Sequence, residues 1–237
     1  MNVADLVDQC WRDPPQVHLR HKDEIWTDWL YNTQRSCYEF ILSSVTKQST
    51  TLETGLGLST ALFARFGNHH TCVVPYQDEI DKLVAYLDER GIEHNVTFLT
   101  GCSDEVLPNL EIDPIDLFFI DGLHGFPTPI IDWFYGAQNL RRGGTLVLDD
   151  VQLRQVQVLD AYLQKDPRWV ELARTWKWVA YRRESDGSLR EGEWEQTTFS
   201  APDSLKDKAS QLAEVALRDA EGLARRTKHR LYRYIRS

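Results

Sequence analysis

Two short apolar runs in this chain end in acidic residues, and the length of one helix separates them. The runs are Leu117–Asp121 and Leu146–Asp150. Apolar runs of this length are typical of strands buried on both faces in a parallel sheet. Residues 128–140 have helix length, so the segment predicts a strand–helix–strand unit with parallel, neighbouring strands. The acids would then share the sheet edge at which open α/β sheets bind ligands.

The rest of the chain predicts further strands and helices in alternation. We expect strands at 51–53, 71–74 and 96–99, and helices at 59–66, 78–90, 103–107 (with Ser103 as its N-cap) and 152–163. Two last strands, 169–174 and 177–182, would form an antiparallel end of the sheet. This order predicts an α/β fold with a doubly wound, mostly parallel sheet of seven strands.

The length allows one large core, since 42% of the 237 residues are hydrophobic. We expect a helical N-terminal flap at 1–46, an α/β domain at 47–183, and an extension at 184–237 with a loop and a long C-terminal helix. The basic end of that helix has three interpretations: cations placed at a helix C-terminus, an arm of a homodimer, or attachment to an anionic surface.

Charge and cysteine content limit the functional classes. A net charge of −9 and a pI of about 5.3 argue against a general nucleic-acid binder. The four cysteines are scattered and have neither metal-ligand spacing nor a disulfide pattern, so a cytoplasmic location is expected. Met1–Asp5 has no signal-peptide character, and no apolar run approaches the about 18 residues of a membrane span.

A glycine-containing turn, Glu53–Thr60, follows the first expected strand and opens a helix. Glycines let the backbone approach a ligand closely, and a helix N-terminus favours polar or anionic groups. The spacing is Gly-x-Gly-x-Ser, which differs from the Gly-x-Gly-x-x-Gly of dinucleotide-binding folds. Taken alone, the turn is equally compatible with a tight strand-to-helix connection that binds nothing.

Three segments together resemble the class I S-adenosylmethionine (SAM) methyltransferases. Glu53–Thr60 resembles the motif after that family's first strand, Phe119–His124 its fourth-strand signature, and Arg142–Asp150 its fifth-strand segment. They occur in the family's order and span roughly residues 50–155. The resemblance implies a Rossmann-like methyltransferase fold and the O-methylation of a small hydroxylated molecule, such as a sugar or a phenol.

The resemblance also implies which residues hold SAM. Those expected around its methionine end are Glu53, Gly55, Gly57, Ser59 and Thr60. Those expected near its adenine are Gly101 and Ser103. Asp121, at the end of the fourth strand, is expected to contact the cofactor as well.

Two positions depart from the family's pattern. Val74 stands where an acidic residue usually accepts both ribose hydroxyls, and Cys102 stands where an aspartate is common. Gln77 or a water molecule is an alternative partner for the ribose. These departures leave a catalytically silent, methyltransferase-like binding protein as the alternative to an enzyme. The glycine spacing and the missing acid both disfavour a nicotinamide-dependent oxidoreductase.

Asp121, Asp149 and Asp150 match the metal-binding set of the catechol-type O-methyltransferases. The resemblance implies that they hold Mg²⁺, which favours oxygen ligands and lowers the pKa of a bound hydroxyl. His124 lies where those enzymes carry a proton-accepting lysine, so we expect it to be the general base.

Each of these residues also has a structural interpretation. Asp149 and Asp150 could cap the following helix, Asp121 could form a turn, and His124 could be held by structural hydrogen bonds. His69 and His70 have no acidic partner nearby in the sequence and are interpreted as polar residues ahead of the second strand.

Overall fold

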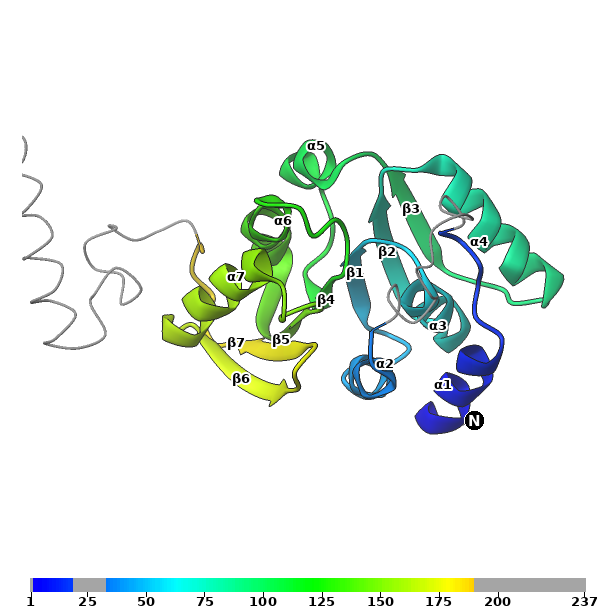
Figure 1. The fold of residues 1–237 in the computed structure, drawn as a ribbon, viewed down its shortest axis with the longest axis horizontal. Helices are drawn as coiled ribbons and strands as arrows, with labels where there is room; N and C mark the ends of the chain where they lie inside the picture. The colour runs from blue at the N-terminus through cyan, green and yellow to red at the C-terminus, as the bar shows by residue number, and fades with distance from the viewer. Residues whose placement is uncertain (1, 19–32, 190–237) are drawn as a thin grey trace, which may run out of the picture. The chain divides into compact units, whose positions relative to one another are not determined.

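Seven strands form one sheet in the order β3-β2-β1-β4-β5-β7-β6. The computed structural model describes residues 2–18 and 33–189, which Figure 1 draws in colour. The strands are β1 (Thr50–Thr54), β2 (His69–Val74), β3 (Val96–Thr100), β4 (Ile115–Ile120), β5 (Leu140–Leu148), β6 (Trp169–Arg174) and β7 (Val179–Arg183). β1 to β5 run parallel, whereas β7 runs antiparallel to β5 and β6. The predicted doubly wound sheet with an antiparallel end is confirmed.

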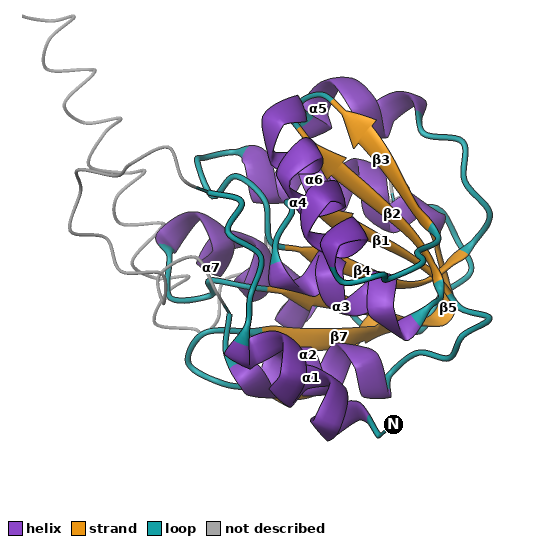
Figure 2. Ribbon diagram, turned by 90° about the vertical axis from the view of Figure 1, so that its right-hand side faces the viewer, coloured by secondary structure: helices purple, strands orange, loops and turns teal. Residues whose placement is uncertain are grey.

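Helices cover both faces of this sheet, as the purple ribbons beside the orange strands show in Figure 2. They are α1 (Val3–Arg12), α2 (Arg35–Ser43), α3 (Leu58–Phe66), α4 (Gln77–Glu89), α5 (Ser103–Val106), α6 (Thr128–Gly136) and α7 (Arg154–Lys165), with short 3₁₀ turns η3 (Leu107–Asn109) and η4 (Ala137–Asn139). Side chains alternate between the faces along each strand. Phe118 and Ile120 pack with residues of α6 and α7, whereas Leu117 and Phe119 pack with α1, α2 and α3.

β5 is longer than the sequence predicts. The apolar run that predicts it begins at Leu146, and the segment that resembles a fifth strand begins at Arg142, but the strand begins at Leu140. Gly143 has a φ of +78°, and the pairing register with β4 shifts between Ile115 and Leu117. A step of five positions along β5, from Leu140 to Thr145, therefore lies against a step of two along β4, and Gly143 provides the left-handed backbone within this irregular part of the strand.

Two details of the helices differ from expectation. Cys102, not Ser103, precedes the first residue of α5, so Ser103 is not its N-cap. α7 is preceded by Leu153, and no side chain caps it, so the interpretation of Asp149 and Asp150 as helix caps is wrong. The helical flap expected at 1–46 contains α1 and α2, but residues 19–32 between them lie outside the described chain, as do residues 190–237 of the expected extension.

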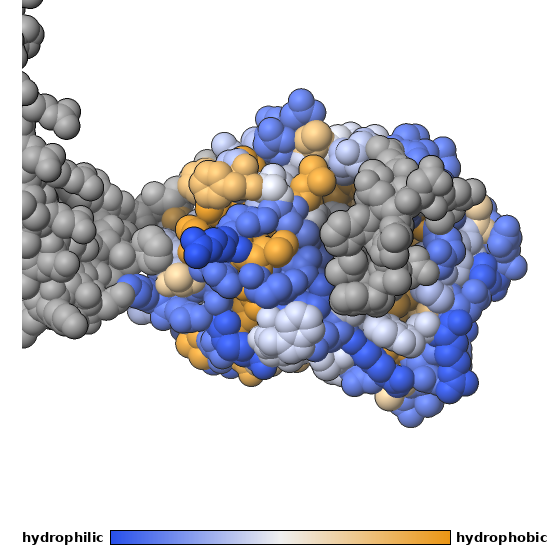
Figure 3. All heavy atoms as spheres, in the orientation of Figure 1, coloured by the Kyte–Doolittle hydropathy of each residue, from blue (hydrophilic) through white to orange (hydrophobic). Residues whose placement is uncertain are grey.

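The surface seen in Figure 3 is mostly hydrophilic, with small, separate apolar patches. The large apolar side chains of the described residues are concentrated in the core between the sheet and its helices. Within residues 2–18 and 33–189, no helix is both long and apolar enough to cross a lipid bilayer.

Candidate cofactor and catalytic site

A cavity of about 350 Å³ opens at the carboxyl edge of the parallel strands. Its walls come mainly from the ends of four strands and the loops that follow them: 54–56 after β1, 73–76 after β2, 101–103 after β3 and 121–124 after β4. This volume lies within the range of sites that enclose a small molecule. The edge predicted from the acid-tipped strands is therefore the edge that carries a cavity.

Gly55 brings the turn after β1 against the end of β4. Its φ is +98°, and a Cβ atom at this position would lie 2.3 Å from the carbonyl oxygen of Asp121. Only glycine avoids both the strained backbone and the clash. Gly55 lines the cavity, and the close approach leaves free space above the turn for a ligand.

The other residues predicted for this turn stabilise it through buried hydrogen bonds. Glu53 is 0% exposed and accepts a hydrogen bond from the Thr60 hydroxyl. The same hydroxyl accepts a hydrogen bond from the Gly57 backbone N–H at 3.0 Å. His70, which lies inside β2, places Nε2 3.3 Å from Glu53 Oε1, so this histidine does have an acidic neighbour. Glu53, Gly57, Ser59 and Thr60 are not among the described residues that line the cavity, whereas Gly101 and Ser103 are.

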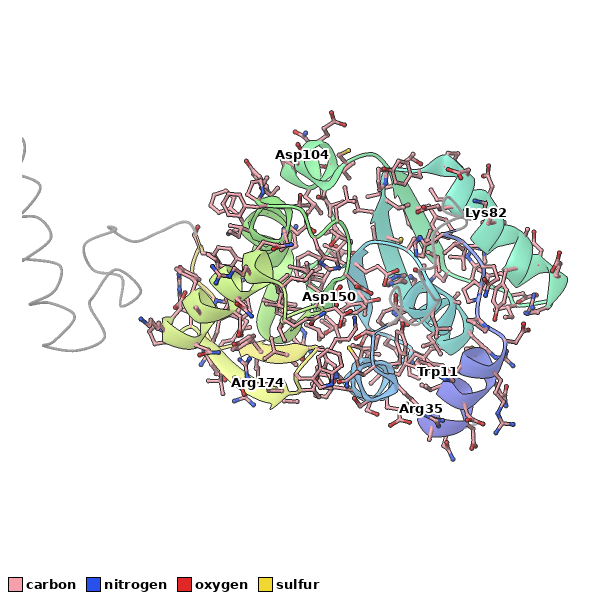
Figure 4. The ribbon with its side chains drawn as sticks, in the orientation of Figure 1. Trp11, Arg35, Lys82, Asp104, Asp150 and Arg174 are labelled. Carbon is pink, nitrogen blue, oxygen red and sulfur yellow. The ribbon has the colours of Figure 1, made fainter. Side chains whose placement is uncertain are left out.

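The three predicted aspartates gather where β4 and β5 end, and Figure 4 labels Asp150 at this edge. Asp121 and Asp150 line the cavity, whereas Asp149 is buried behind it and accepts a hydrogen bond from Thr33. Asp150 has a φ of +54°, a left-handed conformation that aspartate tolerates better than most residues. The sequence-based grouping of these acids is thus reproduced in space.

A lysine completes this cluster. Lys177 Nζ lies 2.5 Å from Asp150 Oδ1 and 3.5 Å from Asp149 Oδ2. Its side chain is only 9% exposed. It lies in the turn that leads into β7, whose first residue, Val179, pairs with Leu148 at the end of β5. Because β7 is antiparallel, its beginning lies at the carboxyl edge of the parallel strands.

These contacts do not suit a metal ion. Asp150 Oδ1 also accepts a hydrogen bond from Gln152 at 2.7 Å, and Asp150 Oδ2 lies 3.0 Å from His124 Nε2. The ammonium of Lys177 therefore occupies the place between the two carboxylates that a cation would take. Over residues 2–18 and 33–189, no group of three His, Cys, Asp or Glu side chains is arranged to hold a metal. The magnesium site stays a prediction that the described residues do not support.

His124 is paired with Asp150 rather than isolated. Its Nε2 lies 3.0 Å from Asp150 Oδ2 and 3.8 Å from Asp121 Oδ1. Its Nδ1 is buried and has no hydrogen-bond partner in the described part of the chain. With Nε2 donating to Asp150, Nδ1 keeps a lone pair and can accept a proton.

The surroundings shift the pKa values of the acids in different directions. Burial and the neighbouring Asp149 and Asp150 raise the pKa of Asp121 well above its ordinary value. Burial also raises the pKa of Asp149, against the lowering effect of Lys177. For Asp150, hydrogen bonds from His124 and Lys177 outweigh the effect of burial and lower the pKa. Asp150 is thus the carboxylate that stays charged beside the imidazole.

Sequence analysis missed three polar residues at this site: Lys177, Glu79 and Asp132. Glu79, in the first turn of α4, lines the cavity and has Oε1 3.5 Å from His18 Nδ1. Asp132, in α6, lines the cavity and is 0% exposed. For Asp132 the available signal is an acid within the apolar stretch Pro129–Phe134. For Lys177 it is the position just before an antiparallel strand.

Comparisons with known proteins agree with this architecture. Residues 52–151 match the family model of a methyltransferase domain. The SAH-bound methyltransferase PaMTH1 of Podospora anserina has 16% identity and a TM-score of 0.57, over 76% of this chain and 88% of that chain. The O-methyltransferase TomG of Streptomyces achromogenes, in complex with SAM, has 16% identity and a TM-score of 0.58, over 76% of this chain and 90% of that chain.

A third structure, the O-methyltransferase of Bacillus cereus in complex with SAH, has 17% identity and a TM-score of 0.52, over 65% of this chain and 83% of that chain. No curated protein matches the sequence. At these identities the likeness is one of fold, and the fold is that of the Rossmann-like methyltransferases.

Proposed function

We propose that this protein is a SAM-dependent O-methyltransferase that acts on a small hydroxylated molecule. The observation that carries the proposal is the continuity of one cavity. It reaches from the Gly55 turn, where the backbone can approach a cofactor, to Asp121, His124 and Asp150, where a proton can be taken up. The methyltransferase-domain match over 52–151 covers every described residue that lines this cavity except His18.

SAM, when bound, would supply an electrophilic methyl group. The residues of this chain would then hold the acceptor hydroxyl in line with that methyl group and remove the proton of the hydroxyl. His124 would take that proton on Nδ1, because Nε2 is oriented by Asp150 at 3.0 Å. The carboxylate of Asp150 would stabilise the imidazolium that forms, as the acid does in an acid–histidine pair.

Glu79 is the residue we assign to the ribose. The side chain of Val74 cannot accept hydrogen bonds from ribose hydroxyls, but Glu79, in the first turn of α4, lines the same cavity. A carboxylate can accept from two hydroxyls at once. We expect Glu79→Gln to weaken the binding of S-adenosylhomocysteine (SAH), while the exposed Asp81→Asn on the same helix leaves it unchanged.

The rim near His124 suggests the acceptor class. Leu123 is 53% exposed and Phe126 is 72% exposed, so apolar surface flanks the proposed base. Exposed aromatic and aliphatic side chains beside a polar site favour a ligand with an apolar ring. We therefore favour a phenol over a sugar as the acceptor. A cytoplasmic location and a homodimer remain predictions from the sequence.

Calorimetric titration with SAM and with SAH tests the cofactor. We expect binding of one molecule per chain, and the absence of binding at millimolar SAM would contradict the proposal. Transfer of a radiolabelled methyl group to a panel of phenols and sugars then separates an enzyme from a silent binding protein. Binding without transfer to any member of a broad panel would favour the silent alternative.

A further inference from the structure

Asp132 is a buried acid that the proposed chemistry does not use. It lies in α6, is 0% exposed and lines the cavity. Its Oδ2 accepts a hydrogen bond from the Thr54 hydroxyl at 2.8 Å. Its Oδ1 is buried and has no hydrogen bond of ordinary geometry among the described residues, although the Ser103 hydroxyl lies close enough to lower the pKa of this carboxyl.

Such a group is uncommon in a folded protein. Buried polar atoms nearly always have a partner, because losing water without gaining a hydrogen bond is unfavourable. An orphaned oxygen at the wall of a cavity is explained if a ligand supplies the missing donor. Asp132 thus indicates a hydrogen-bond donor on whatever fills this part of the cavity.

The position of Asp132 limits which hydrogen-bond donor of a ligand can reach it. Thr54 points to the face of the sheet covered by α6, and Ser103, at the start of α5, lies on the same side. Cys102, which precedes Ser103, also lines the cavity and provides an uncharged wall that is suited to a flat group. On the other face, the N-terminus of α3 favours an anion, and α3 begins at Leu58, directly after the glycine turn.

SAM carries three kinds of hydrogen-bond donor: its ribose hydroxyls, which we assign to Glu79, the ammonium of its amino acid, and the amino group of its adenine. The ammonium is attached to the carbon that bears the carboxylate, which Asp132 would repel. The adenine amino group is uncharged and belongs to a flat ring that the walls beside Asp132 can accommodate. Resting on the proposed function, we propose that Asp132 accepts a hydrogen bond from the amino group of the cofactor's adenine and selects adenine over purines that lack it.

Two ligands that differ by this group test the inference: SAH and its purine-riboside analogue, in which hydrogen replaces the amino group. Their dissociation constants are measured by calorimetry with the wild-type protein, with Asp132→Ala and with Asp104→Asn. Asp104 is an exposed acid on α5, labelled in Figure 4. It controls for a change of charge near the site.

We expect the wild type and Asp104→Asn to bind SAH about tenfold more tightly than the analogue, because the analogue leaves Asp132 unpaired. In Asp132→Ala the preference should fall to less than about threefold, mainly through weaker binding of SAH. Asp132→Asn keeps the size of the side chain and should show an intermediate preference, which provides a second test if the alanine variant does not fold.

Equal binding of both ligands by the wild type would overturn the inference but leave the proposed function intact. An equal loss of affinity for both ligands in Asp132→Ala would assign Asp132 to another part of the cofactor and would also overturn it. Failure of the wild type to bind SAH at all would instead contradict the proposed function.

Discussion

His124 has two nitrogens in different environments, and the proposed chemistry depends on that difference. Nε2 is held by Asp150 at 3.0 Å, and Nδ1 is free of protein partners in the described chain. We expect His124→Gln to lower kcat by about 10²- to 10⁴-fold, the usual contribution of a general base. Binding of SAH should change by less than about threefold, because the base acts on the acceptor rather than on the cofactor.

Stopped-time methyl-transfer assays and calorimetry measure the two quantities. The exposed His69, at the beginning of β2, provides the control, and His69→Gln should leave both unchanged. A His124→Gln variant that keeps wild-type kcat would show that this histidine is only structural.

Lys177 changes the expected role of the acids. Its single positive charge lies 3.5 Å from Asp149 Oδ2 and 2.5 Å from Asp150 Oδ1, so both carboxylates already face a cation that the protein itself provides. We expect methyl transfer to be the same before and after dialysis against EDTA, and added Mg²⁺ to have no effect. Activity that is lost in EDTA and restored by Mg²⁺ would instead support the magnesium site inferred from the sequence.

Sequence reasoning found the acids but could not find their partner. Asp121, Asp149 and Asp150 could be grouped because parallel strands end at the same edge. Lys177 is 27 positions from Asp150 and belongs to an irregular turn, so neither spacing nor periodicity marks it. Asp132 and Glu79 lie on helices whose rotation toward the cavity depends on tertiary packing, which one sequence does not specify.

At the scale of the elements, one buried acid of α7, Asp160, forms hydrogen bonds to the antiparallel end of the sheet. Asp160 accepts hydrogen bonds from Arg174 Nη1 and Nη2 at 2.9 and 2.8 Å, and from the Tyr181 hydroxyl. Arg174 belongs to β6 and Tyr181 to β7. The carboxylate therefore joins three elements through a bidentate, charge-assisted contact.

We expect Asp160→Asn to lower the free energy of unfolding by about 1–2 kcal/mol, since Asp160 is nearly buried but Arg174 can still be hydrated. The matched control is Glu171→Gln. Glu171 contacts the same arginine but is 40% exposed, so its loss should cost less than about 0.5 kcal/mol. Urea unfolding measures both, and equal effects of the two substitutions would contradict the assigned role of Asp160.

The sequence predicts the strands that have strong apolar patterns. It does not predict a strand's first residue where the local backbone conformation determines it. β4 contains the apolar run that predicted it, because those residues are buried. β6 lies at the predicted residues 169–174, at the antiparallel end of the sheet. β5 begins six residues before the apolar run that predicted it, because an irregular part of the strand around Gly143, with a φ of +78°, still leaves Leu140 paired with Ile115. A glycine with a positive φ is compatible with a loop or with an irregular strand, and only the pairing with β4 distinguishes them.

At the scale of the whole molecule, Asp132 links stability to pH. Burial raises the pKa of Asp132 to about 6, against the lowering effects of the nearby Ser103, Thr54 and His124. Its pKa in the unfolded chain is about 3.9. Between these values the folded protein binds more protons than the unfolded chain, so this residue's contribution to stability falls as pH rises from about 4 to about 6.

The Asp132→Asn variant has no titratable group at this position, so its stability should not decrease for this reason as the pH rises. Relative to the wild type without cofactor, its free energy of unfolding should rise by about 2 kcal/mol between pH 4.5 and pH 7, which is most of the about 3 kcal/mol that corresponds to the whole pKa difference. Urea unfolding at the two pH values measures the change, and Asp88→Asn should show none, because Asp88 is an exposed acid of α4 that is not among the groups named as acting on Asp132. A stability difference between Asp132→Asn and the wild type that stays constant with pH would mean that Asp132 titrates as an ordinary, hydrated acid. The same acid that is proposed to recognise adenine would then lack the buried environment on which that recognition depends.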